Sequence, residues 1–130
     1  MMRNTWLYAG ASLFSAYLVF QSCQDERTIR TAQYAVNGQK LYHLHCQNCH
    51  GAKGEGLGAL YPSLRDSLSL RARHSELPCL IRNGFAEMPP NPQLTPVEIA
   101  YVLTYLTNSF GNRMGLYSLE GVETALADCR

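Results

Sequence analysis

The chain has 130 residues, 46% of them hydrophobic and 16% charged, which is enough for one domain with one core. With 11 basic and 10 acidic residues, its formal net charge is +1, without the basic excess of a nucleic-acid-binding domain. We therefore expect a single globular domain and no nucleic-acid partner.

The N-terminus is typical of an export signal. An apolar run extends from Trp6 to Phe20. At about 15 residues it is shorter than the roughly 20 needed for a membrane-spanning helix. The following Ser22 and Cys23 resemble the lipobox of bacterial lipoproteins, although Phe20 stands where that pattern prefers leucine. We predict lipidation at Cys23, with an uncleaved membrane anchor or simple secretion as alternatives.

The chain divides into four predicted segments. Residues 1–22 form the export signal of lipoprotein type, and residues 23–32 form a charged, polar tether without apolar periodicity. Residues 33–112 form the working domain, and residues 113–130 form a C-terminal extension.

Within the domain, a helix is predicted before residue 46. Ala35, Gly38, Tyr42 and His45 fall near one side of it, and Gly38 leaves a flat spot where another helix can approach closely. His43 and His45 point about 200° apart on a helix, so they cannot share one ion with ideal geometry. We expect neither histidine to be a ligand.

Two cysteines separated by two residues stand directly before a histidine, from Cys46 to His50. A structural zinc site needs four ligands, yet Cys79 and Cys129 stand far apart. A thioredoxin-like pair needs a preceding strand and a following helix, whereas here a helix precedes and a glycine-rich loop follows. The motif favours covalent haem attachment through Cys46 and Cys49, with His50 as an iron ligand.

Met88 is the candidate for the second axial ligand. Pro89 and Pro90 follow it, which prevents a helix and imposes an extended loop from which a thioether can approach iron. Met114, His74 or an open site remain as alternatives.

Two further helices are expected in the domain. A weaker one runs from about Ser75 to Asn83 and is ended by Gly84. A stronger one starts after Thr95 and runs to about Asn108, with a glycine stop at residue 111. Its signals are an N-cap, a first-turn proline, a capping-box glutamate and apolar residues at helical spacing: Thr95, Pro96, Glu98, Ile99, Val102, Leu103 and Leu106.

Together with the cysteine–histidine motif, the stretches "GAKGEGLG", "YPSL", "MPP" and "LTPVEIAYVLTYL" resemble class I (mono-haem) cytochromes c. The closest likeness is to small bacterial periplasmic or lipoprotein-anchored members, over about residues 33–112. The resemblance implies an all-α fold, with three to four helices wrapped around one covalently bound haem c and with the N- and C-terminal helices crossing. It places Gly38 and Tyr42 at that crossing, near Tyr105.

The same resemblance implies the site residues. Cys46 and Cys49 would form thioether bonds, and His50 and Met88 would be the axial ligands. The carbonyl of Pro62 would accept the His50 ring N–H, although this chain has tyrosine before Pro62 where the family often has glycine. A ligating imidazole usually donates its second N–H to a fixed acceptor, which supports this role; the alternative is a plain turn proline.

Cys79 and Cys129 remain after one cysteine for lipid and two for haem. Outside the cytoplasm they could pair, and a disulfide closing about fifty residues would stabilise the fold by roughly 4 kcal/mol. The alternative is two separate thiols. Val122, Leu126 and Cys129 could form a short helical face, which would pack on the domain or on a partner.

These observations predict an exported one-electron carrier on the periplasmic side of a bacterial membrane, with redox proteins as partners. Methionine ligation and haem burial predict a positive potential. One rival function is a haem catalyst such as a peroxidase, with an open or displaceable sixth position and His74 as a distal group. Another is the electron-transfer subunit of an oxidoreductase complex.

Overall fold

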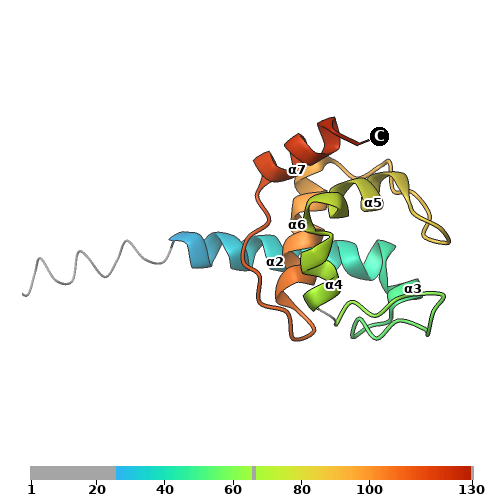
Figure 1. Ribbon diagram of the computed structural model, residues 1–130. Coiled ribbons are helices and arrows are strands. Elements are labelled where there is room, and N and C mark those ends of the chain that lie inside the picture. Colours follow the sequence, from blue (N-terminus) through green and yellow to red (C-terminus); the bar gives the residue numbers. More distant parts are fainter. Residues whose placement is uncertain (1–25, 66, 130) are drawn as a thin grey trace, which may run out of the picture. The chain divides into compact units, whose positions relative to one another are not determined.

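The computed structural model describes residues 26–65 and 67–129. Their contacts define two compact units that divide between Arg30 and Thr31, and the features below belong to the second unless stated. The helices in chain order are α2 (Glu26–His45), α3 (Gln47–His50), α4 (Ser67–Ala72), the 3-10 turn η1 (His74–Glu76), α5 (Leu77–Asn83), α6 (Pro96–Asn108) and α7 (Leu119–Ala127) (Figure 1). The described residues form no strand beyond two isolated bridges, which confirms the all-α prediction.

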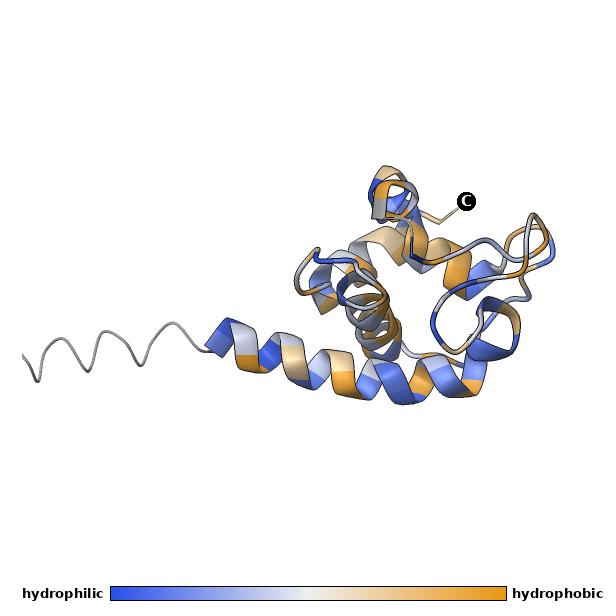
Figure 2. Cartoon of the chain, turned by 90° about the horizontal axis from the view of Figure 1, so that it is seen from below, coloured by the Kyte–Doolittle hydropathy of each residue, from blue (hydrophilic) through white to orange (hydrophobic). Residues whose placement is uncertain are grey.

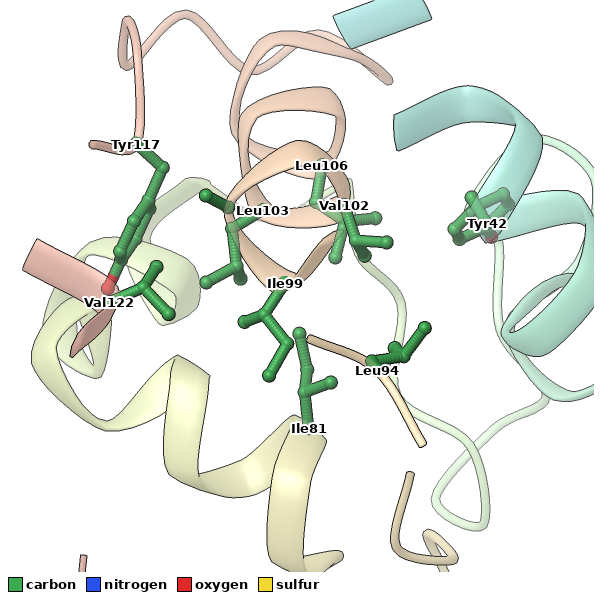
Figure 3. Close-up of a cluster of buried hydrophobic side chains, with 10 residues drawn as sticks. Tyr42, Ile81, Leu94, Ile99, Val102, Leu103, Leu106, Tyr117 and Val122 are labelled. Carbon is green, nitrogen blue, oxygen red and sulfur yellow. The ribbon is translucent and has the colours of Figure 1, made fainter. Parts of the chain in front are cut away.

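Helix α6 is the centre of the core. Its capping box is present as predicted, because the Glu98 N–H donates to the Thr95 hydroxyl and the Glu98 carboxylate accepts from the Thr95 N–H at 2.8 Å. The bonds that the carboxylate accepts from the Thr95 N–H and from the Thr95 hydroxyl hold the pKa of Glu98 below its usual value. The apolar side chains of α6 form one cluster with those of α5 and α7 (Figure 3). The cluster includes Ile81, Ile99, Val102, Leu103, Leu106 and Val122.

Helix α2 crosses α6 at Gly38. A Cβ atom at this position would lie 1.9 Å from the carbonyl oxygen of Tyr101 and 2.8 Å from the Cβ of Tyr105. Tyr42, one turn later, is fully buried and its ring lies 5.4 Å from that of Tyr105. The predicted crossing is therefore observed, and it needs a residue without a side chain.

Gly38→Ala is expected to lower the free energy of unfolding by about 3 kcal/mol, because the backbone of α6 must move to make room. The gain in helix propensity of about 1 kcal/mol is smaller than this cost. Asn37→Ala, at an exposed neighbouring position, is the control. Denaturant unfolding measures both, and equal stabilities for the two variants would contradict the close approach.

The described part of the predicted polar tether is helical, because α2 already begins at Glu26. Residues 26–30 are exposed, and Arg30 pairs with Glu26 at 3.1 Å one turn apart. Hydrophilic and hydrophobic residues mix along α2 (Figure 2). The missing apolar periodicity thus indicated exposure and not the absence of a helix.

Two other elements differ from the prediction. The short helix α4 has no counterpart among the predicted helices, and the weaker helix consists of the turn η1 followed by α5. Helix α6 ends as expected at Asn108, but Ser109 is its C-cap, and Phe110 and Gly111 follow in the left-handed region with φ of 58° and 94°.

The C-terminal extension packs on the domain. Helix α7 contacts both α5 and α6 (Figure 1), with Tyr117 and Val122 buried in the core. The Ser118 hydroxyl caps α7 by accepting from the Gly121 N–H at 3.1 Å. In the structure a disulfide joins Cys79 of α5 to Cys129, with Cα atoms 5.6 Å apart.

The predicted export signal and Cys23 lie outside the described residues. Within residues 26–65 and 67–129, no helix has the length and apolar character needed to span a bilayer.

Candidate haem site

The cysteine–histidine motif forms the turn that follows α2. Cys46 donates its N–H to the carbonyl of Tyr42 and accepts from the N–H of His50 at 3.0 Å, so the single turn of α3 continues from the end of α2. In a helical turn, residues three and four apart lie on one side. Both thiols are half-buried, and Cys46 and His50 line the same cavity.

Tyr42 of α2 contacts the end of this turn. Its buried hydroxyl donates to the carbonyl of Gly51, directly after His50, at 2.5 Å. Burial, followed by the nearby Cys46, raises the pKa of Tyr42 to about 12. Burial raises the pKa of Tyr117 to about 12 as well. In the unfolded chain both phenols lose their protons near the ordinary pKa of 10.0, which is lower than in the folded protein. The contribution of the two tyrosines to the free energy of unfolding is therefore fully present below pH 10 and declines as the pH rises towards 12.

Tyr42→Phe is expected to lower the free energy of unfolding at neutral pH by about 1 kcal/mol, since the Gly51 carbonyl loses its donor. The same variant should lose less stability between pH 10 and 12, because one of the two protected phenols is gone. Denaturant titrations at several pH values measure both effects. Tyr34→Phe, earlier on α2, is the control, and an identical alkaline decline in wild type and Tyr42→Phe would disprove the assignment.

His50 is oriented by the loop that follows it. Its Nδ1 lies 3.0 Å from the carbonyl oxygen of Pro62, and since a carbonyl only accepts, the ring nitrogen is the donor. This bond leaves Nε2 available as a metal ligand. The loop is tight: the Leu57 N–H donates to the Tyr61 carbonyl at 2.7 Å, and a Cβ at Gly56 would lie 2.3 Å from that same oxygen.

Asn112 anchors the other end of this loop. The side chain is buried, and its Nδ2 donates to the carbonyls of Leu64 and Leu106, each at 2.9 Å. It thereby ties the loop that carries Pro62 to the end of α6. Nothing in the local sequence pointed to this residue, because the bond to Leu64 joins segments far apart in the chain.

Met88 lies on a tight turn after α5. Phe85 and Met88 exchange two backbone hydrogen bonds of 3.0 and 2.9 Å, and Ala86 takes a left-handed conformation with φ of 50°. A Cβ at Gly84 would lie 2.5 Å from the Met88 carbonyl oxygen. The expected extended loop therefore begins only after Met88, where the prolines stand, and the turn before it sets the position of Met88.

His50 and Met88 line one cavity of about 380 Å³. This volume lies in the range of small-molecule and cofactor pockets. The lining is mainly apolar and comes from the loop before α4 and from α4, α5 and α6: Leu60, Leu64, Leu70, Leu77, Leu80, Ile81, Leu103 and Leu106. A thiol, an imidazole with one free nitrogen and a thioether in such a cavity fit a covalently bound haem.

The model of one protein family, described as cytochrome c oxidase, cbb3-type, subunit III, matches residues 33–106, more than half of the chain. The chain belongs to this family. It is a c-type cytochrome of the mono-haem class I kind, its domain binds haem c covalently, and the family acts in electron transfer. A search of the curated proteins found no match.

The remaining histidines and Met114 of the cytochrome are not among the residues that line the cavity. His43 and His45 are exposed on α2, and the His43 ring bonds to the side chain of Gln47. The His74 ring stacks on Tyr117 at 4.3 Å, in a separate groove beside α7. Met114 is not among the cavity-lining residues. Across residues 26–65 and 67–129, no three metal-binding side chains cluster.

The thiol-exchange function is disfavoured by the surroundings of Cys46. Burial, and to a smaller extent the neighbouring Cys49 thiol, raises the pKa of the Cys46 thiol to about 11. Reactive Cys-x-x-Cys pairs instead hold one thiol pKa below the ordinary value, so that the thiolate forms near neutral pH. The cytochrome's motif is therefore suited to attachment and not to thiol exchange.

Proposed function

We propose that this cytochrome is a one-electron carrier whose haem is bound to Cys46 and Cys49 and whose iron is held by His50 and Met88. The observation that carries the proposal is the convergence of His50 and Met88 on one apolar cavity from α3 and from the turn after α5. The haem supplies a store for one electron, because its iron alternates between the ferrous and ferric states.

The chain's own residues hold and tune this site. The Pro62 carbonyl orients His50, and the rigid turn at Met88 holds the thioether in the cavity. Thioether ligation and an apolar lining both favour the ferrous state, so we expect a positive potential. The exposed Leu60 and Phe85 at the same cavity offer an apolar edge for a small, transient interface with redox proteins. The net charge of +1 argues against strong electrostatic steering.

A catalytic function finds less support. A peroxidase needs acid–base groups beside an open iron position. Among the described residues, the charged side chains that line the cavity are Arg73 and Glu87, and Arg73 is paired with Glu76 at 2.9 Å. A redox titration tests the proposal: we expect a single one-electron transition and no turnover of peroxide, whereas sustained turnover would refute it.

The proposed location is the periplasmic face of a bacterial membrane, with a lipid anchor at Cys23. The apolar run before Cys23 and the typical export of c-type cytochromes support it. Cys23→Ala is expected to move most of the haem from the membrane fraction to the soluble fraction, measured by a pyridine-haemochrome spectrum. A haem that stays with the membranes in this variant would count against lipidation.

A second candidate is a fixed electron-transfer subunit of an oxidase complex. The description of the matching family, which names an oxidase subunit, favours it. The chemistry at the iron is the same, and only the partner differs. Co-purification from mildly solubilised membranes separates the two: a fixed subunit remains with other subunits through gel filtration, and a free carrier elutes alone.

A further inference from the structure

Helix α5 and the turn of Met88 are packed closely together. A Cβ at Gly84 would meet both Met88 and Pro90, so the chain folds back closely on the end of the helix. The Asn91 N–H then donates to the Ile81 carbonyl at 3.1 Å. We therefore expect a shift of α5 to displace Met88.

Arg82 of α5 bonds to the end of the loop that carries Met88. Its guanidinium donates to the Leu94 carbonyl at 3.0 Å, immediately before the N-cap of α6. The Arg82 Nε is buried and has no hydrogen-bond partner within the described part of the chain.

Helix α5 is too short to hold its own position. It has 7 residues, whereas isolated helices of fewer than about 12 to 15 residues are marginal in water. One side of it packs on α6 through Ile81. It also contacts α7, which lies outside residues 33–106.

The C-terminal extension supports α5. Cys129 is joined to Cys79 near the start of α5, and Val122 of α7 is fully buried in the shared core. The Tyr117 hydroxyl donates to the His74 carbonyl at 2.5 Å, and its ring stacks on that of His74 just before α5. The disulfide and the two contacts of Tyr117 reach α5 or η1 from residues beyond the family match.

We propose that the extension is a brace: helix α7 and the Cys79–Cys129 disulfide fix α5, and α5 in turn positions the Met88 thioether. The proposal deepens the proposed function and rests on Met88 as a ligand. Cys79 and Cys129 act as positioning residues here, through α5 and without contact to the iron. The brace sets how readily an outside ligand displaces Met88.

The test uses the full-length holoprotein with Cys79→Ser and Cys129→Ser combined. Imidazole is titrated into the ferric protein, where it competes with Met88. We expect the serine pair to retain its haem and to bind imidazole about tenfold more tightly, which corresponds to about 1.4 kcal/mol. Glu123→Ala, at an exposed position of α7, is the matched control and should bind imidazole as wild type does.

Hydrogen exchange separates positioning from a general loss of stability. The N–H groups of Phe85 and Met88 should exchange faster in the serine pair, whereas those of Val102 and Leu103 in α6 should remain protected. Equal acceleration at all four amides, or unchanged imidazole affinity, would overturn the brace. Two alkylatable thiols in the unreduced, folded wild type, detected by mass spectrometry, would also overturn it.

The absorption spectrum and the imidazole titration distinguish a failure of Met88 ligation from a failure of the brace. A wild-type ferric protein without the weak long-wavelength absorption band of iron–thioether coordination refutes the Met88 ligation, and the brace with it. A wild type that has the band, together with a serine pair of unchanged affinity, refutes the brace alone.

Discussion

Replacing both Cys46 and Cys49 by serine is expected to abolish covalent haem retention. The structure places the two residues one helical turn apart, directly before His50, and a hydroxyl does not form the thioether bonds that hold the porphyrin. After denaturing electrophoresis, haem staining should show essentially none of the wild-type signal. Each single variant should keep one bond and retain an intermediate amount.

The matched control is the pair Cys79→Ser and Cys129→Ser, which removes the same number of sulfur atoms elsewhere. It should retain its haem fully on the denaturing gel. Full haem retention in the Cys46/Cys49 pair, or loss of haem only in the control, would contradict the assignment of the attachment site.

Met88→Ala is expected to lower the reduction potential by a large part of the roughly 0.8 V over which axial ligands tune haem proteins. The thioether stabilises ferrous iron, and the Met88 turn is fixed by its bonds to Phe85, so no neighbouring residue replaces the ligand without rearrangement. The potential is measured by spectroelectrochemical titration.

Met114→Ala is the control, because Met114 is a half-buried methionine after α6 that does not line the cavity. Its potential should match that of wild type. If Met114→Ala lowered the potential and Met88→Ala did not, the axial ligand would have to be reassigned.

Local chemistry made some elements predictable. The start of α6 depends on a capping box that involves only Thr95 and its near neighbours, and the structure shows it. Gly38 was identified from its place among apolar residues, and it lies where α2 crosses α6. The bond from His50 to the Pro62 carbonyl was expected from the resemblance and from the behaviour of ligating histidines, and the two atoms lie at hydrogen-bonding distance.

Other features depend on contacts between distant segments and had no sequence signal. The bond from Asn112 to Leu64 forms only when the loop and the end of α6 meet. The placement of α7 was left open, because a short apolar face does not specify what it packs against. The start of α2 was missed for a different reason, since exposed polar helices lack the periodicity that marks buried ones.

The absorption spectrum of the ferric holoprotein tests the central claim most directly, because it reports the atom bound opposite His50. We predict the weak long-wavelength band of iron–thioether coordination in the wild type and its complete loss in Met88→Ala. Absence of the band in wild type, or its persistence in Met88→Ala, would contradict a site in which His50 and Met88 hold the iron from two sides.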